Sequence, residues 1–193
     1  AILETYLKFI DRRSAVSESQ LGNFELKGHY VVISYNEIAE KIIKHYLDFG
    51  KQVLLIDIDP DVHDVMHEYH ENMRCIYADM YDPDTWEELQ FAETEAIISC
   101  MVDGKEAEVG LLRWQKNMNL NIPFIVVTNS HKETVELYKN GATYVIQTEE
   151  LAAERFQELL NKYGEFLNQL GVKGKDHHVS FKEVMGRIST RFM

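Results

Sequence analysis

The middle of the chain alternates short hydrophobic runs with longer segments in which hydrophobic residues recur every three or four positions. The short runs, rich in β-branched residues, predict strands, and the longer segments predict helices between them. The predicted strands are Tyr30–Ser34, Val53–Asp57, Arg74–Tyr77, Ala96–Cys100, Phe124–Thr128 and Tyr144–Gln147. The predicted helices are Ile38–Phe49, Asp61–Glu71, Asp84–Gln90, Lys105–Met118, Lys132–Asn140 and Glu149–Leu170.

These strands are continuous hydrophobic runs without a polar alternation, as expected when helices cover both faces of a parallel sheet. Strand–helix–strand repeats with connections of this length favour right-handed crossovers between parallel strands. The sequence therefore predicts an α/β fold, with a doubly wound, Rossmann-like parallel sheet of six strands. We expect the strand order 3-2-1-4-5-6, helices on both faces and a long C-terminal helix.

Composition and charge exclude some classes of partner. Hydrophobic residues make up 45% of the chain and charged residues 27%, which is typical of a protein with a buried core. The net charge of −12 argues against binding to nucleic acid or to an anionic lipid surface. The two cysteines, Cys75 and Cys100, are too few for a disulfide scaffold and indicate a reducing compartment.

In a sheet of this type a ligand binds beyond the carboxyl ends of the strands, where the strand order reverses. The turn after the first strand therefore takes the place of a glycine-rich phosphate loop, but all three glycines of G-x-G-x-x-G are replaced, by Ser34, Asn36 and Ala39. Glu37 adds a negative charge to the first helical turn, where an anion would otherwise bind. The turn thus disfavours a dinucleotide held through its pyrophosphate.

The second strand ends in a residue suited to the ribose of a nucleoside. Asp57 follows Ser34 by 23 residues, and an acid at this position accepts hydrogen bonds from the ribose hydroxyls. Asp59 follows two residues later. Because aspartates at strand ends also cap helices, a purely structural role is the alternative to a nucleoside contact.

Four segments together resemble the TrkA-N domain, also called the RCK domain (regulator of K⁺ conductance). They are GHYVVISYNEIAEKIIKHYLDFGKQVLLIDIDPD at residues 28–61, YADMYD at 77–82, ISCM at 98–101 and NGATYVI at 140–146. The resemblance covers about 130 residues, from Lys27 to Phe156. The order and spacing of the segments carry it, rather than any one motif.

The start of the chain adds to this likeness. YLKFIDRR at residues 6–13 resembles the stretch that leaves the last transmembrane helix in Kef-type cation:proton antiporters and in RCK-gated K⁺ channels. The resemblance implies an amphipathic linker from a membrane domain at residues 1–26. It also implies an RCK/TrkA-N Rossmann-like domain at 27–156, and a C-terminal helix and tail at 157–193.

The resemblance implies a regulatory domain rather than an enzyme, on the cytoplasmic side of the cell membrane. Such a domain senses a ligand and gates transport by a monovalent cation (K⁺ or Na⁺)/proton antiporter. The RCK domain of a K⁺ channel, gated by nucleotide or Ca²⁺, is the alternative. The expected partners are the protein's own transmembrane transport domain and a second copy of the chain. The late helices Lys132–Asn140 and Glu149–Leu170 would form that homodimer.

The resemblance also suggests the ligand, since members of this family bind AMP, ATP or NAD(H), and some bind divalent cations. The replaced glycines make AMP or another adenine nucleotide a better fit than NAD. Ca²⁺ stays open, as does an empty pocket with a purely structural role. By position, the ligand-binding residues of the family fall on Ser34, Tyr35, Asn36, Glu37, Ile38, Asp57, Ile58, Asp59, Asp79, Met80, Cys100 and Met101.

Within this set, the first five residues form the phosphate turn and Asp57 is the ribose acid. By the same resemblance Asp79 and Met80 flank the adenine, and Cys100 and Met101 line the inner wall. Further aspartates, Asp82, Asp84 and Asp103, fall at the same edge of the sheet. So many carboxylates could hold Ca²⁺, and the alternative is that these aspartates cap helices, since Asp84 and Asp103 stand where helix caps are expected.

Signals for other chemistry are weak. His63, His67 and His70 have the spacing of metal ligands on one helix face, or of a solvated stripe. The chain has no G-x-S-x-G elbow, Walker loop, H-E-x-x-H or C-x-x-C motif. Cys100 has no base beside it in the sequence. A small nucleotide-dependent oxidoreductase is therefore only the alternative of another class.

Overall fold

The computed structural model describes residues 27–66, 68–89 and 91–169. The chain divides into two compact units, Ala1–Leu151 and Ala152–Met193. The predicted linker at residues 1–26 and the tail after residue 169 lie outside the described residues, as does His67. Among the helices that are described, none is long and hydrophobic enough to cross a membrane.

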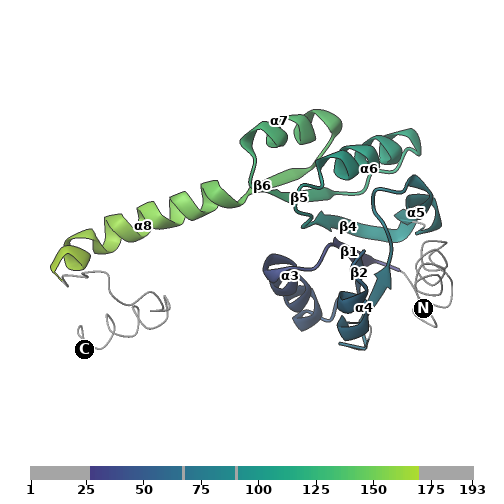
Figure 1. The fold of residues 1–193 in the computed structure, drawn as a ribbon, viewed down its shortest axis with the longest axis horizontal. Coiled ribbons are helices and arrows are strands. Elements are labelled where there is room, and N and C mark those ends of the chain that lie inside the picture. Colours follow the sequence, from purple (N-terminus) through teal and green to yellow (C-terminus); the bar gives the residue numbers. More distant parts are fainter. Residues whose placement is uncertain (1–26, 67, 90, 170–193) are drawn as a thin grey trace, which may run out of the picture. The chain divides into compact units, whose positions relative to one another are not determined.

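The first unit is built on a six-stranded sheet (Figure 1). Its strands are β1 (His29–Ile33), β2 (Val53–Asp57), β3 (Met73–Tyr77), β4 (Thr94–Ser99), β5 (Phe124–Thr128) and β6 (Tyr144–Gln147). All five pairings are parallel, and the order β3-β2-β1-β4-β5-β6 confirms the predicted topology. Because β1 pairs with both β2 and β4, the strand order reverses at β1, where a ligand is expected.

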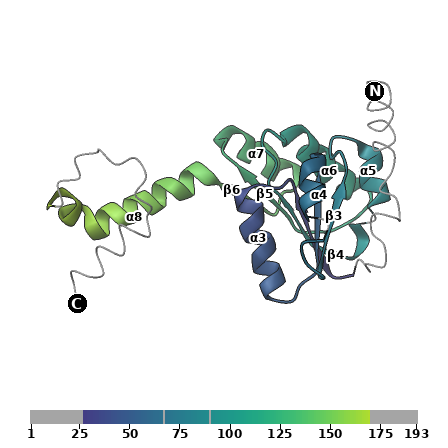
Figure 2. The same cartoon turned by 60° about the horizontal axis from the view of Figure 1, so that its bottom comes forward.

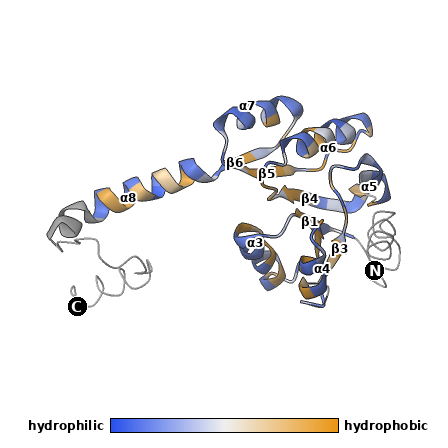
Figure 3. Ribbon diagram, viewed as in Figure 1, coloured by the Kyte–Doolittle hydropathy of each residue, from blue (hydrophilic) through white to orange (hydrophobic). Residues whose placement is uncertain are grey.

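Helices connect the strands and cover both faces of the sheet (Figures 1 and 2). They are α3 (Glu37–Asp48), α4 (Pro60–Met66), α5 (Pro83–Glu88), the 3₁₀ turn η1 (Phe91–Glu93), α6 (Lys105–Asn117), α7 (His131–Asn140) and α8 (Thr148–Gln169). The long helix α8 begins in the first unit and continues into the second. Figure 3 shows hydrophobic colours along β1 and β5, and mixed colours on α3 and α8.

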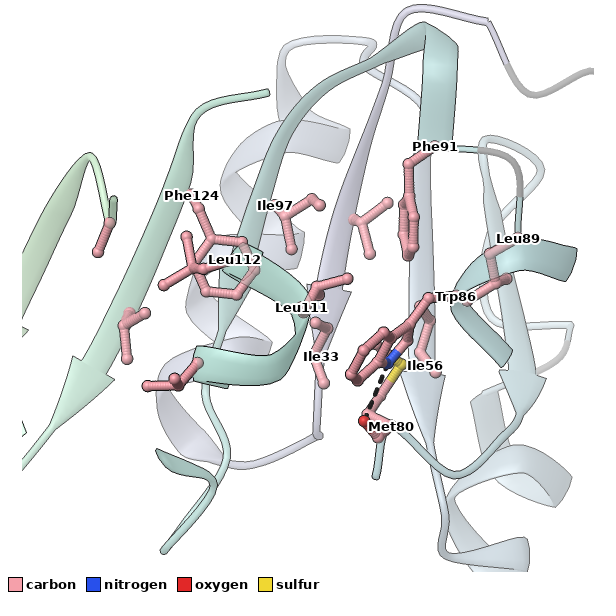
Figure 4. Packing of buried hydrophobic residues seen from close by; sticks show 14 of the residues in the cluster. Ile33, Ile56, Met80, Trp86, Leu89, Phe91, Ile97, Leu111, Leu112 and Phe124 are labelled. Carbon is pink, nitrogen blue, oxygen red and sulfur yellow. Dashed lines mark hydrogen bonds between the residues drawn. The ribbon is translucent and has the colours of Figure 1, made fainter. Parts of the chain in front are cut away.

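One core lies between the sheet and helices α5, α6 and α7. Ile33, Ile56 and Ile97 from the strands pack with Trp86 of α5 and Leu111 of α6 (Figure 4). The indole Nε1–H of Trp86 donates a hydrogen bond of 3.0 Å to the carbonyl oxygen of Met80 (Figure 4). This bond ties α5 to the loop after β3, and so fixes the loop on which predicted ligand-binding residues lie.

The other core lies on the opposite face, under α3 and α4. Ala39 and Ile43 of α3 pack against Val32, Leu55 and Ile98 of the sheet. Ala39 is fully buried, as expected of a small residue at the helix-packing position of the lost glycine motif. The replacement of that glycine therefore preserves the contact between α3 and β1.

The helix predicted over Asp61–Glu71 is too long, because α4 ends at Met66. The chain then turns: the backbone N–H of Tyr69 donates to the carbonyl oxygen of Met66, and the N–H of Asn72 donates to Nδ1 of His70. This side-chain acceptor competes with continuation of the helix. His70 therefore lies outside the helix, and the predicted shared helix face for His63 and His70 is wrong.

Candidate ligand-binding site at the carboxyl ends of the strands

The turn between β1 and α3 contains no glycine, but one of its residues adopts a backbone conformation that is typical of glycine. Ser34 has a φ angle of 67°, in the left-handed region that normally favours glycine. Its backbone N–H donates a 2.8 Å hydrogen bond to the carbonyl oxygen of Ile56, which holds the turn against β2. The first lost glycine is therefore replaced by a strained serine in the same conformation.

Asn36 closes the N-terminus of α3 with its own side chain. Its Oδ1 accepts hydrogen bonds from the N–H groups of Ile38 (3.0 Å) and Ala39 (3.1 Å). Its Nδ2 donates to the carbonyl oxygen of Cys100 at 2.7 Å. Free N–H groups at a helix N-terminus are what bind a phosphate. Here the Asn36 amide already occupies two of them, and it also links α3 to the end of β4.

The carboxylate of Asp57 connects two neighbouring turns. Its Oδ2 accepts from the N–H of Tyr35 at 2.6 Å, and its Oδ1 accepts from the N–H of Asp59 at 2.8 Å. Each oxygen retains a second lone pair that could accept from a ribose hydroxyl. Asp59 in turn accepts from the N–H of Asp61, at the start of α4. The capping role thus falls to Asp59, while Asp57 faces a cleft.

That cleft, which we call the nucleoside cleft, has a volume of about 220 Å³. It is lined by Ile33, Ser34, Ile56, Asp57, Ile58, Ala78, Asp79, Met80, Tyr81, Met101 and Val102. Six of the predicted ligand-binding residues are among them. Tyr81 and Val102 were not predicted, although each directly follows a predicted residue beyond a strand end. The Tyr81 hydroxyl donates to the carbonyl oxygen of Asp103 at 3.0 Å, so it joins the loops after β3 and β4.

A second cavity of about 140 Å³ adjoins the carboxyl ends of β4 and β5. It is lined by Asn36, Ile38, Cys100, Met101, Val102, Asp103, Gly104, Glu108, Val127, Thr128, Asn129, Glu133 and Thr148. Met101 and Val102 line both the second cavity and the nucleoside cleft. Burial raises the pKa of the Cys100 thiol to about 12, with Glu108 adding to the shift. The thiol is therefore protonated at neutral pH and is not a nucleophile.

Glu108 of α6 is the most buried acid of the second cavity, at 3% exposure. Its Oε1 accepts a 2.6 Å hydrogen bond from the Ser99 hydroxyl. The pKa of this carboxyl group is raised to about 7, chiefly by burial and also by the nearby charges of Glu133 and Glu106, against the opposing effect of the Ser99 hydrogen bond. The sequence does carry a signal for Glu108, since it is an acid among residues of α6 that face the core, but the signal was missed.

The remaining predicted residues lie around these cavities. Tyr35 and Asp59 reach neither cavity and instead donate their N–H groups to Asp57, and exposed Glu37 lies in the first turn of α3. Within residues 27–66, 68–89 and 91–169, no three His, Cys, Asp or Glu side chains are grouped to hold a metal ion. The Ca²⁺ alternative thus gains no support from the described aspartates.

The helix caps differ from those predicted at this edge. The N-cap of α5 is Asp82, whose Oδ1 accepts from the N–H of Asp84, so Asp84 lies inside the helix. The N-cap of α6 is Gly104, without a side-chain hydrogen bond, and Asp103 precedes it with a φ angle of 57°. Asp82 therefore has a structural role, whereas Asp103 lines the second cavity.

A comparison with known protein families matches residues 30–148 to the TrkA-N domain, which is more than half of the 193 residues. The chain belongs to the TrkA-N domain family. The match includes all twelve predicted ligand-binding positions and confirms the resemblance drawn from the sequence. The strand order and the edge of the sheet described above are therefore those of a TrkA-N domain.

This TrkA-N domain is similar to a protein named as the K(+) efflux antiporter KefB of Alkalimonas amylolytica, with 27% identity over 137 residues. The match covers 69% of this chain and 20% of that relative, so the chain spans about one fifth of the relative's length. Among solved structures, it is similar to the TrkA-N domain of inner membrane protein YbaL from Escherichia coli. That likeness has a TM-score of 0.64 and 17% identity, and covers 70% of this chain and 98% of the other.

Two further solved structures share the fold of this TrkA-N domain. One is the Shewanella denitrificans Kef CTD in its AMP-bound form, with a TM-score of 0.53, 13% identity, and coverage of 85% of this chain and 89% of that one. The other is the GsuK channel bound to NAD, with a TM-score of 0.57, 17% identity, and coverage of 73% and 25%. At these identities the likeness shows a common fold.

Proposed function

We propose that this TrkA-N domain is the cytosolic, ligand-sensing regulatory domain of a monovalent cation (K⁺ or Na⁺)/proton antiporter. The similarity to KefB supports an antiporter, because that relative is named as one and the chain matches one fifth of it. The partner would then be the protein's own transmembrane transport domain, and the domain would lie on the cytoplasmic side of the membrane. The likeness to the GsuK channel supports the alternative, an RCK domain of a K⁺ channel.

The ligand of this proposal is an adenine nucleotide of the size of AMP rather than NAD. The observation that carries it is Asp57, which is buried at the end of β2, accepts a backbone hydrogen bond at each oxygen and lines the nucleoside cleft. Asn36 argues against NAD, because its amide occupies N–H groups that would otherwise hold a pyrophosphate. The AMP-bound Kef CTD supports the same size of ligand on the same fold.

Regulation requires two arrangements of the assembled protein that bind the ligand with different affinity. A homodimer through the late helices would provide them. Val135 and Tyr138 of α7 and Leu151, Phe156 and Leu160 of α8 support this arrangement, because each is at least 45% exposed in the chain described here. Hydrophobic residues left exposed on a helix are candidates for contacts with another protein chain.

Isothermal titration of the full chain with AMP, ADP and NAD⁺ tests the proposed ligand. AMP is expected to bind, and Asp57→Asn to weaken binding at least tenfold, since the ribose hydroxyls lose a charged acceptor worth roughly 1.4 kcal/mol. Asp59→Asn is the matched control, because Asp59 reaches neither cavity and the substitution is the same. Tighter binding of NAD⁺ than of AMP, or equal effects of the two variants, would contradict the proposal.

A further inference from the structure

The second cavity lies where the 5′ substituent of a bound nucleoside would point. In doubly wound folds the acid at the end of the second strand binds the ribose hydroxyls, and the turn after the first strand lies beside the 5′ group. Asn36 of that turn lines the second cavity, and Met101 and Val102 line both cavities. A ligand whose ribose contacts Asp57 therefore directs its 5′ substituent from the nucleoside cleft toward the second cavity.

The charged residues that line the two cavities are all acidic. Acids lining the two cavities are Asp57, Asp79, Asp103, Glu108 and Glu133, and no described lining residue is Lys, Arg or His. The N-terminus of α3, which would otherwise attract an anion, is satisfied by Asn36 and carries Glu37 in its first turn. A phosphate on the 5′ carbon would therefore meet several carboxylates and no compensating positive charge.

Glu108 is a buried acid of the second cavity, and no described residue that lines this cavity is positively charged. Its carboxyl group is buried, its Oε1 accepts from Ser99, and the described residues make no other hydrogen bond to it. Glu133 lines the same cavity from α7, where its Oε2 accepts from the Thr128 hydroxyl. A buried carboxyl group without a compensating charge tends to keep its proton, as the raised pKa of Glu108 indicates, and a positively charged ligand beside it would favour the ionised form. Among the described lining residues, none supplies that charge.

We infer that, among adenine ligands of AMP size, the site prefers one whose 5′ substituent is positively charged. An ammonium or sulfonium group would occupy the second cavity and face Glu108 and Glu133, while the adenosine part occupies the nucleoside cleft. This inference rests on the proposed function, since it assumes that the ribose contacts Asp57. It goes beyond it by assigning the second cavity to a cationic group.

The test is a titration of the full chain with three adenosines that differ only at the 5′ position. They are 5′-amino-5′-deoxyadenosine, adenosine and AMP, which carry a positive, a neutral and a negative 5′ group at neutral pH. At low ionic strength we expect the amine to bind about tenfold more tightly than adenosine, and AMP, the ligand of the proposed function, to bind more weakly than the amine. Added salt is expected to reduce the advantage of the amine.

Substitutions of the acids that line the second cavity test whether these acids bind the positively charged group. Glu108→Gln, which keeps an oxygen to accept from Ser99, is expected to lower the affinity for the amine to that for adenosine and to leave adenosine unchanged. Glu136→Gln is the matched control, since Glu136 lies on α7 but lines neither cavity. If AMP binds most tightly, or if the amine keeps its advantage in both Glu108→Gln and Glu133→Gln, the inference is wrong while the proposed function stands. If none of the three adenosines binds, both fail.

Discussion

The buried carboxyl group of Glu108 makes a quantitative prediction about stability. Its pKa rises from an ordinary 4.5 to about 7 in the folded chain, chiefly because burial disfavours the charged form. In the unfolded chain the group is solvated and ionises at its ordinary pKa. The folded protein therefore holds this proton over a range of pH in which the unfolded chain has lost it. Linkage then requires that stability falls as the pH rises from about 4.5 to about 7.

The size of this effect follows from the shift. Each pKa unit corresponds to roughly 1.4 kcal/mol, so the full shift destabilises the folded chain by at most about 3 to 4 kcal/mol above pH 7. Glu108→Gln removes the charge and keeps an acceptor for the Ser99 hydroxyl. We expect this variant to be more stable than the wild type above pH 7, by about 2 to 3 kcal/mol. The two should converge at low pH.

Urea unfolding at a series of pH values on either side of 7 measures this difference. The groups that face Glu108 are Glu133 from α7, Glu106 from α6, Cys100 at the end of β4 and Tyr81 from the loop after β3. Glu106→Gln is the control, since its side chain is 72% exposed on the same helix and pairs with Lys105. If the stability curves of wild type and Glu108→Gln run parallel across the whole range, Glu108 ionises as it does in the unfolded chain. The reasoning from burial would then be refuted.

Three further predictions concern the turn after β1 and the long helix α8. Ser34→Gly is expected to stabilise the chain by about 0.5 to 1 kcal/mol in urea unfolding. The variant relieves the backbone strain of a left-handed serine, and this gain exceeds the cost of the greater conformational entropy of glycine in the unfolded chain. Asn36→Gly frees two N–H groups of α3, so titration should show tighter binding of AMP relative to adenosine; an unchanged ratio would mean that Asn36 does not block the phosphate. Phe156→Asp places a charge on an exposed hydrophobic side chain of α8 and is expected to shift a dimer to the monomer, as measured by light scattering across a concentration series.

The sheet could be predicted from the sequence because its signal is local. Each strand contains a short run of hydrophobic residues, and β2 is buried at all five positions, as expected of a strand covered on both faces. The end of α4 could not be predicted in this way. The chain after Met66 makes turn hydrogen bonds, from the N–H of Tyr69 to Met66 and from the N–H of Asn72 to His70, which the periodicity of hydrophobic residues does not indicate.

The candidate site also has features that the sequence predicts and features that it does not. Asp57 could be placed because a strand end and its distance from the first turn are visible in the sequence. The cap that Asn36 forms on α3 is local, but its link to the end of β4 could not be predicted, since that link is a hydrogen bond to the carbonyl oxygen of Cys100, 64 residues away. The left-handed conformation of Ser34 likewise has no local signal, because serine rarely adopts it without support from the surrounding fold.

Replacement of the three glycines changes what a ligand can do in this domain. Ser34 adopts the glycine conformation, Asn36 supplies the acceptor that a phosphate would supply, and Ala39 keeps the packing of α3. The N-terminus of α3 is therefore satisfied before any ligand arrives, and a phosphate would gain little by displacing a side chain already in place. Under the proposed function, differences in affinity between two arrangements of the protein would then arise at the nucleoside cleft and the second cavity. The loops after β3 and β4, joined by Tyr81, and the acids Glu108 and Glu133 are the groups positioned to produce them.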